Sequence, residues 1–422
     1  MTRTAAPSSG TSANSAVLSK RAMKKILLSL ALAAAALCAT AQTRDWVTTW
    51  ATALQVAEPH NRPPQPGLAG NSFRQIVQVS IGGKALRLHL SNIFNETETE
   101  ILGVEIARAR TMGASPEIVP GSSVALSFDG RRGVTMAAGG EAVSDPVDFR
   151  LAPRENIAIT IHYGQVSDQP LTSHPGSRTT SYIALGDTED FSAPAAQTAH
   201  WYTISAIDVL PRRKSAAICV LGDSITDGRG TTTDGQDRWT DQLSRSLLER
   251  CRTRNLAVLN FGLGGNCVLQ GGLGPTGASR YARDLFGQCG VKYVILFEGT
   301  NDLGSGKSGE AVAAGIQAVW TQIAQEAHAR GIKVIAATVT PAKGSFYEKD
   351  GTGEHEKGRQ LLNAWIRGSE LFDGVIDFAR MVADPQDPDK LDPAYLFEND
   401  WLHLNAKGYE VMGRGVDRRL FY

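Results

Sequence analysis

Five short apolar runs recur along the second half of the chain, and each is followed by a polar or helical segment. The runs do not alternate polar and apolar residues, which is typical of strands that are buried on both faces of a sheet. Strands that alternate with amphipathic helices form a parallel sheet with right-handed crossovers. The five runs are residues 216–221, 256–262, 291–299, 332–339 and 374–379, and the helical patterns between them cover residues 237–251, 278–288, 309–331 and 356–372. The sequence therefore predicts an α/β fold, a doubly wound three-layer α/β/α domain with five parallel strands, over residues 212–422.

The first half of the chain has a different period. Between Thr43 and Leu210 the segments are short, alternate polar with apolar residues and are rich in β-branched side chains, with glycine-rich turns between them. Many short strands at regular spacing predict an all-β sandwich or jelly-roll-like domain over residues 43–210. Pro211 and the three basic residues after it mark the boundary between the two halves. A length of 422 residues also favours two domains.

The amino terminus has the pattern of a targeting segment. Three basic residues, Arg21, Lys24 and Lys25, precede the apolar stretch 26–38, and Ala39-Thr40-Ala41 matches a cleavage site. The apolar stretch is short for a membrane span. We therefore expect residues 1–41 to be a leader and signal peptide that is cleaved near Ala41, and the mature protein to be secreted or periplasmic.

The charge balance and the cysteines narrow the classes of ligand. Lys+Arg and Asp+Glu are equal at 43 each, so nothing favours nucleic acid or an anionic membrane as a partner. No stretch has the ligand spacing of a metal site, and we expect neither a metal nor a cofactor. In an oxidising compartment Cys267 and Cys289 form a disulfide or stay free, and the sequence leaves both possibilities open.

Chemically useful residues follow several of the predicted strands. The first run leads into Gly222-Asp223-Ser224, and the second leads into Gly264-Gly265-Asn266. The third run leads into "EGTND", which contains Asn301. Near the carboxyl terminus, Asp400 precedes His403 by three residues. Parallel strands end at one edge of a sheet, where open α/β proteins bind ligands. On the local stretch alone, Asp223 and Ser224 are equally well explained as a helix cap.

Taken together, these residues supply the parts that acyl transfer from an ester requires. A serine hydroxyl needs a base to take its proton, and His403 is a natural base for Ser224 near neutral pH. A carboxylate, Asp400, would orient that histidine. The tetrahedral oxyanion needs fixed donors, for which the backbone N–H groups of Ser224 and Gly265 and the side-chain amide of Asn301 are candidates.

The same residues resemble the four sequence blocks of the SGNH (GDSL-type) hydrolase superfamily. The blocks are G-D-S-I-T-D, G-G-N, G-T-N-D and D-W-L-H, and they lie within residues 216–422. The resemblance implies a flavodoxin-like α/β/α fold, the triad Ser224, Asp400 and His403, and an oxyanion hole made by Ser224, Gly265 and Asn301. Further stretches, such as "GLGGN" and "FEGTNDLG", are similar to a branch of two-domain bacterial arylesterases and carbohydrate esterases. Cys267 departs from the basic or polar residue expected there in that branch.

Other candidate residues have a plainer interpretation. Asp227, Glu298 and Asp302 lie next to turns and are more simply explained as helix caps or loop supports than as extra acids. Trp401, beside His403, fits a sugar-stacking platform or packing under its loop equally well. "GLGPTG" at 272–277 follows no strand and contains Pro275, which argues against a dinucleotide site.

The sequence thus predicts a secreted serine esterase that hydrolyses short-chain acyl or acetyl carboxylic esters, on carbohydrate, through an acyl-enzyme. Its partner would be a small-molecule or polysaccharide ester. The alternatives are a lysophospholipase or thioesterase with the same triad, and a non-catalytic glycan-binding protein on this scaffold. The amino-terminal domain could cover apolar surface, bind glycan or extend the active site; we expect residues 212–422 alone to hydrolyse small aryl esters.

Overall fold

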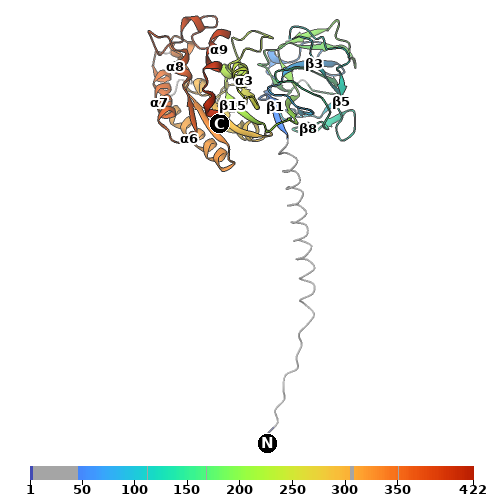
Figure 1. Cartoon of the computed structure of the whole chain (residues 1–422), viewed down its shortest axis with the longest axis horizontal. Coiled ribbons are helices and arrows are strands. Elements are labelled where there is room, and N and C mark those ends of the chain that lie inside the picture. Colours follow the sequence, from blue (N-terminus) through green and yellow to red (C-terminus); the bar gives the residue numbers. More distant parts are fainter. Residues whose placement is uncertain (3–45, 112, 168, 305–307, 350) are drawn as a thin grey trace. The chain divides into compact units, whose positions relative to one another are not determined.

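The protein is described from a computed structural model, which covers residues 1–2 and 46–422 except residues 112, 168, 305–307 and 350. Residues 46–422 form one compact unit (Figure 1). The predicted leader and signal peptide, residues 1–41, lies outside the described residues apart from Met1 and Thr2. The division of the remainder at residues 210–212 stays a prediction.

The second half of the chain contains the five-stranded parallel sheet that the apolar runs predict. Its strands are β15 (Ala216–Gly222), β16 (Leu256–Gly262), β17 (Val291–Phe297), β18 (Lys333–Ala337) and β19 (Gly374–Ile376). They are ordered β16-β15-β17-β18-β19, and every neighbouring pair is parallel. The order reverses direction at β15, so the chain winds to both sides of this strand. The predicted α/β fold class is confirmed.

Helices cover both faces of this sheet. Alternate residues of β15 belong to different cores: Cys219 packs in the cluster that contains Trp320, whereas Val220 packs in the cluster that contains Trp239. Because all these side chains are buried, the strand has no polar face, which explains its unbroken apolar run. The helices are α2 (Ser224–Asp227), α3 (Trp239–Leu248), α4 (Gly277–Tyr281), α5 (Thr300–Leu303), α6 (Gly309–Ala329), α7 (Glu354–Gly368), α8 (Phe378–Val382) and α9 (Ala406–Gly415). A π-helical turn, η2 (Ala282–Phe286), continues α4, and 3-10 turns are η1 (Pro59–Asn61), η3 (Phe346–Glu348), η4 (Pro393–Tyr395) and η5 (Arg418–Phe421).

The first half of the chain forms antiparallel sheets, as its alternating pattern predicts. One sheet has the order β1-β14-β4-β8, a second β13-β10-β2, and a third β12-β11-β3-β9-β5-β6 with β7 also paired to β5. The strands are β1 (Val47–Ala51), β2 (Gln55–Val56), β3 (Ser72–Gln78), β4 (Leu86–Ser91), β5 (Thr99–Arg108), β6 (Val124–Ala125), β7 (Val134–Met136), β8 (Glu141–Val143), β9 (Asn156–Tyr163), β10 (Thr172–His174), β11 (Ser181–Ala184), β12 (Ala196–Thr198), β13 (Trp201–Tyr202) and β14 (Ile204–Val209). We refer to residues 46–210 as the β region.

The β region and the parallel sheet share a hydrophobic core. Residues of β1, β3 and β14 pack in the same cluster as Leu221 and Leu259 of the parallel sheet. An isolated parallel bridge joins Thr52 to Asn260, and the N–H of Val258 donates to Ser80 Oγ at 2.9 Å. Strand β16, the last in its sheet, therefore does not present a free edge to solvent.

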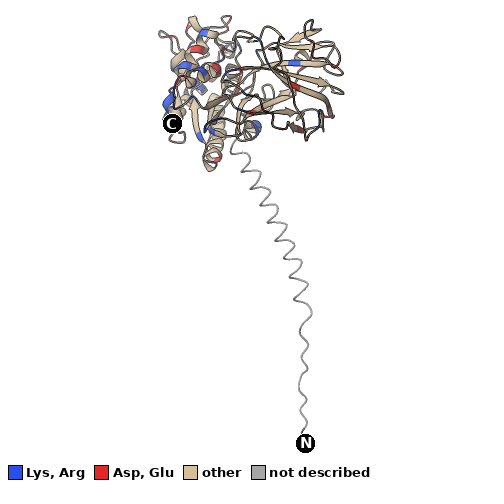
Figure 2. Ribbon diagram, turned by 45° about the vertical axis from the view of Figure 1, so that its right-hand side comes forward, with Lys and Arg blue, Asp and Glu red and all other residues tan. Residues whose placement is uncertain are grey.

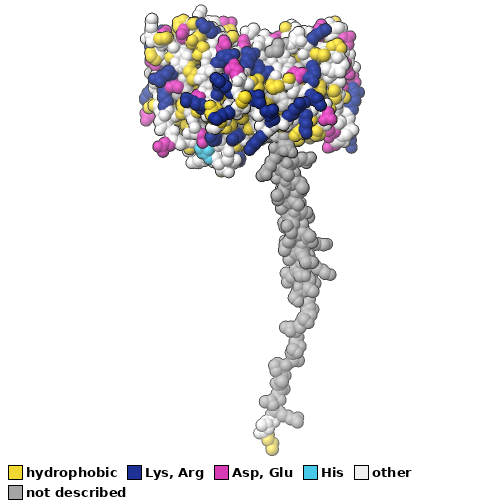
Figure 3. All heavy atoms as spheres, in the orientation of Figure 1, with side chains coloured by type: hydrophobic (Ala, Val, Ile, Leu, Met, Phe, Trp, Pro, Cys, Tyr) yellow, Lys and Arg dark blue, Asp and Glu magenta, His cyan; other side chains and the backbone are white. Residues whose placement is uncertain are grey.

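Charged residues keep largely to the helices and loops, and the strand ribbons carry few of them (Figure 2). On the face seen in Figure 3, basic side chains gather across the middle of the molecule, with acidic and apolar side chains among them, although the formal net charge of the whole chain is zero. In the described part of the chain, no helix combines the length and the hydropathy needed to cross a membrane.

Candidate active site

Ser224 is placed by the turn from β15 into α2. The strand ends at Gly222, and Asp223 caps the helix by accepting the N–H of Ile225 at 2.9 Å. A side chain at Gly222 would place its Cβ 2.3 Å from Thr226 Oγ1, so only glycine fits between the strand and the helix. Ser224 is the first helical residue and is 5% exposed. The helix-cap interpretation of Asp223 is thus correct, and it leaves Ser224 for another role.

His403 and Asp400 reach Ser224 from a loop that follows η4. The hydroxyl Oγ of Ser224 lies 2.8 Å from His403 Nε2, and His403 Nδ1 lies 2.6 Å from Asp400 Oδ2. The other oxygen of Asp400 accepts the N–H groups of Leu402 and His403. Because Nδ1 faces a carboxylate it carries the hydrogen, which leaves Nε2 free to accept the hydroxyl proton of Ser224.

Hydrogen bonds keep Asp400 ionised. Partial burial would raise the pKa of this carboxyl, but the bonds from the His403 ring and from two backbone N–H groups outweigh burial and hold the pKa below its usual value. Trp401, between the two site residues, has φ +58° and packs on the turn at Gly344, where a Cβ would lie 3.3 Å from its ring. Of its two interpretations, packing under the loop is the one for which the structure gives contacts.

Besides Ser224, which follows β15, the candidate oxyanion donors come from the segments after β16 and β17. Gly265 has φ +68°, a backbone conformation that favours glycine. Among the described residues, neither the N–H of Ser224 nor that of Gly265 has a hydrogen-bond acceptor. Asn301, in α5, donates one amide hydrogen to the carbonyl of Asn266 at 2.7 Å, and its other amide hydrogen stays available.

A buried polar network fixes these loops. Asn266 is fully buried. Its side-chain amide donates to the backbone carbonyls of Leu273 and Pro275, and its side-chain oxygen Oδ1 accepts from Arg280 Nε at 3.0 Å. The carboxylate of Asp302 accepts the N–H groups of Val268 and Leu269, both at 2.8 Å. The predicted interpretation of Asp302 as a loop support agrees with these bonds.

Three carboxyl groups beneath the loops have raised pKa values. Burial is the main cause in each case, and it raises the pKa of Asp302 to about 6, of Asp223 to about 7 and of Glu298 to about 8. Arg280, which is also buried, partly opposes the shift at Glu298, since its Nη2 lies 3.6 Å from Oε1 of that residue. Glu298 therefore does not cap a helix; it is a buried acid beside a buried cation.

The β region contributes residues that the sequence analysis did not identify. His174 Nε2 lies 3.0 Å from Asp227 Oδ1, and Arg178 Nη2 lies 3.2 Å from Asp227 Oδ2. Asp227 was interpreted as a cap or loop support, but its carboxylate forms ion pairs with the β region instead. The available signal was the polar run "SHPGSR" at 173–178, which places a histidine and an arginine four positions apart around a proline and a glycine.

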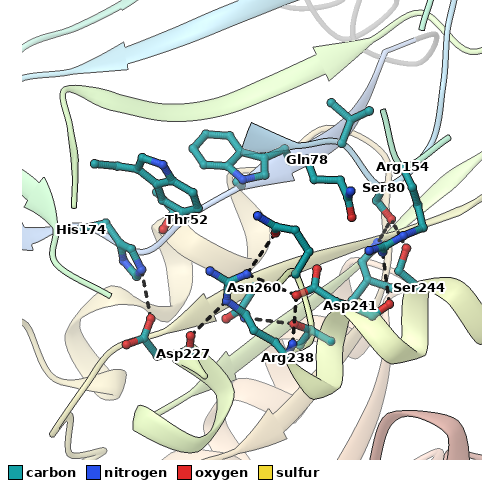
Figure 4. Close-up of a pocket in the computed structure, with 17 residues that line it drawn as sticks. Thr52, Gln78, Ser80, Arg154, His174, Asp227, Arg238, Asp241, Ser244 and Asn260 are labelled. Atoms are coloured by element: carbon teal, nitrogen blue, oxygen red, sulfur yellow. Dashed lines mark hydrogen bonds and ion pairs between the residues drawn. The ribbon is translucent and has the colours of Figure 1, made fainter. Parts of the chain in front are cut away.

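A small cavity lies next to this contact. It has a volume of about 50 Å³, and its lining includes Trp50, Gln78, His174, Asp227 and Arg238 (Figure 4). Ser224 and His403 do not line it, so it is not the place where an ester meets the nucleophile. Its position between the β region and α2 and α3 makes it an interior space of the contact.

The described residues hold neither a disulfide nor a cluster of metal-binding side chains. Cys219, Cys251, Cys267 and Cys289 are all free, so the possibility of a disulfide between Cys267 and Cys289 is not realised in the structure. Cys267 is buried, and burial raises its pKa to about 12. In the part of the chain that the structure describes, no cluster of His, Cys, Asp or Glu could hold a metal ion.

Comparison with known proteins identifies the class. Residues 220–411, which contain every residue of the candidate site, match the model of the GDSL-like Lipase/Acylhydrolase family. A search among curated proteins finds no match. This family match supports a carboxylic ester hydrolase. More narrowly, residues 220–411 are similar to the GDSL-like Lipase/Acylhydrolase family, which agrees with the resemblance of the four sequence blocks to the SGNH superfamily.

Several solved structures are similar to about half of the chain. A carbohydrate acetylesterase from Sinorhizobium meliloti is 18% identical, with 48% of this chain and 96% of that one covered and a TM-score of 0.37. An inhibitor-bound aryl esterase from M. smegmatis is 17% identical, with 48% of this chain and 96% of that one covered and a TM-score of 0.36. A GDSL-like lipase from Bacteroides thetaiotaomicron is 20% identical, with 48% of this chain and 87% of that one covered and a TM-score of 0.36.

Proposed function

We propose that this protein is an exported serine esterase that removes short acyl groups from carbohydrate esters through a Ser224-His403-Asp400 triad. The observation that carries the proposal is the continuous chain of hydrogen bonds from Ser224 Oγ to His403 Nε2 and from His403 Nδ1 to Asp400. A helix cap at Ser224 would require neither the histidine nor the carboxylate behind it.

The proposed reaction has two halves. His403 takes the hydroxyl proton as Ser224 Oγ attacks the ester carbonyl, and Asp400 stabilises the imidazolium that forms. The N–H groups of Ser224 and Gly265 and the amide of Asn301 bind the oxyanion. His403 then returns the proton to the departing alkoxide, which leaves an acyl-enzyme. In the second half, His403 takes a proton from water as the water attacks this ester, and it gives that proton to Ser224 Oγ as the carboxylic acid is released.

A small acyl group and an exported location are the finer parts of the proposal. Leu273, which is half exposed, lies against Gly265, and Tyr347 donates its hydroxyl hydrogen to Asn301 Oδ1, so two of the three candidate oxyanion donors have a bulky neighbour. Bulk at these positions favours short acyl chains. The basic and apolar pattern of residues 21–41 supports export, where polysaccharide esters are accessible.

Kinetics of two variants test the triad. We expect Ser224→Ala and His403→Ala each to lower kcat on an aryl acetate by about 10⁴-fold or more, without additive loss in the double variant, because the residues act as one unit. A Ser224→Ala enzyme within about tenfold of wild type would contradict the proposal.

A substrate series tests the finer assignment. We expect kcat/KM to fall from aryl acetate to butyrate to octanoate, and acetate to be released from acetylated xylan. A maximum at octanoate would favour the lysophospholipase-type alternative. Binding of the polysaccharide without hydrolysis of any ester would favour the glycan-binding alternative.

A further inference from the structure

Asp227 joins helix α2, which begins at Ser224, to residues 174–178 of the β region and to Arg238 before α3. It is the last residue of α2, three positions after Ser224, and it is 2% exposed. Burial would raise the pKa of its carboxyl, but Arg178, His174 and Arg238 outweigh burial and lower the pKa below its usual value. The carboxylate is therefore charged at neutral pH, and it depends on those cations to stay buried.

The backbone packs against this carboxylate from two sides. A Cβ added to Gly176 of the β region would lie 1.9 Å from Asp227 Oδ2, and a Cβ on Gly264 would lie 3.7 Å from the same oxygen. A Cβ on Gly262 would lie 2.2 Å from the backbone nitrogen of Asp227. The end of α2 is thus held between residues 174–178 and the turn 262–265, which carries the oxyanion donor Gly265.

The histidine of this contact is itself fixed. His174 Nδ1 lies 2.8 Å from the carbonyl oxygen of Ala53, and its ring stacks on Trp201 at a centroid distance of 5.6 Å (Figure 4). One ring nitrogen thus faces a backbone carbonyl oxygen and the other faces the carboxylate of Asp227, so the ring bridges Ala53 and α2. A second link comes from Arg238, the N-cap residue of α3, which donates to the backbone carbonyls of Asp227 and of Ser177.

We propose that residues 174–178 are a positioning element of the active site. By holding Asp227 they determine where α2 places the hydroxyl and the N–H of Ser224 relative to the N–H of Gly265. The inference rests on the proposed function of Ser224, and it assigns the β region a part in catalysis. Oxyanion donors act because they are fixed before the reaction, and a displacement of about 1 Å costs about 10²-fold in rate.

Variants in the full-length protein test this role. We expect His174→Gln and Arg178→Ala to lower kcat on aryl acetate by about 10- to 100-fold, with KM within about twofold of wild type, because substrate contacts remain. Arg178→Lys keeps a cation near Asp227 and should recover part of the loss. Rates are expressed per active site, titrated with a fluorophosphonate, so that misfolded protein is not counted.

A buried histidine elsewhere in the β region supplies the matched control. His162 is 1% exposed, forms an ion pair with Glu105 and lies 2.8 Å from Ser72 Oγ, with no partner from residues 216–422 among its described contacts. His162→Gln should lower the thermal stability as much as His174→Gln does and leave kcat per active site unchanged. Equal effects of the two substitutions on kcat would overturn the proposal.

A double-variant comparison isolates the contact. Asp227→Asn removes the charge that His174 faces, so adding His174→Gln should change kcat by no more than about threefold beyond Asp227→Asn alone. Full additivity of the two losses would show that His174 acts elsewhere and would overturn the proposal. Ser224→Ala, assayed in parallel, separates this outcome from failure of the triad: if it stays active, the proposed function fails first.

Discussion

At the level of single residues, Asn301 is held at both ends of its amide. Its nitrogen donates to the carbonyl of Asn266, and its oxygen accepts the hydroxyl of Tyr347. An amide fixed in this way keeps its second hydrogen in one direction, which is what an oxyanion donor requires. Both bonds are formed before any substrate is present.

We therefore expect Asn301→Ala to lower kcat on aryl acetate by about 10²- to 10³-fold with little change in KM. Tyr347→Phe is the matched control: it removes one bond to Asn301 but leaves the donor, so its effect should be much smaller. Steady-state kinetics of both variants measure this. A raised KM with kcat intact in Asn301→Ala would mean that Asn301 binds substrate instead.

At the level of elements, the carboxyl ends of β15 and β17 lie over a cluster of buried acids. Arg280, from α4, joins these ends by donating to the carbonyl of Gly222 at 2.9 Å and approaching Glu298. Neither oxygen of Glu298 has a hydrogen-bond donor among the described residues. A buried carboxyl in this position is more stable with its proton than without it.

The raised pKa of Glu298 gives a prediction for stability. The unfolded chain loses this proton near pH 4, whereas the folded protein keeps it up to about pH 8, so stability is greatest below the unfolded pKa and falls as the pH rises between the two values. Glu298→Gln should lose fewer degrees of Tm than wild type between pH 5 and pH 9. Glu310→Gln, at an exposed position, should behave as wild type. Parallel loss in wild type and Glu298→Gln would contradict the buried-acid interpretation.

At the level of the whole molecule, the β region and the parallel sheet depend on each other. The sequence favoured an independent half at residues 212–422, but that fragment would lose the cations on Asp227, the acceptor for Val258 N–H and part of a shared core. We now expect the isolated fragment to aggregate, or to hydrolyse aryl acetate at less than about 1% of the full-length rate. Size-exclusion chromatography and kinetics measure both. A folded fragment within tenfold of the full-length rate would contradict this expectation.

The limits of the sequence analysis follow from how far apart the interacting residues lie. The strand ends and the residues of the four blocks could be predicted, because apolar runs mark strands and the resemblance assigns the roles of Ser224, Gly265, Asn301, Asp400 and His403. Contacts such as His174 to Asp227 join segments with unrelated patterns, so no local period predicts them. The helix α9 was missed although Tyr409 and Met412 repeat at helical spacing after the cap Asn405, because the stretch is short and glycine-rich.

The central claim is that Ser224 is the nucleophile and that His403 activates it. Mass spectrometry of the full-length protein after reaction with a fluorophosphonate tests this most directly. We predict one adduct per chain on the peptide that contains Ser224, none in Ser224→Ala, and labelling slowed by at least about 10³-fold in His403→Ala. An adduct on another residue, or undiminished labelling of Ser224→Ala, would contradict the account.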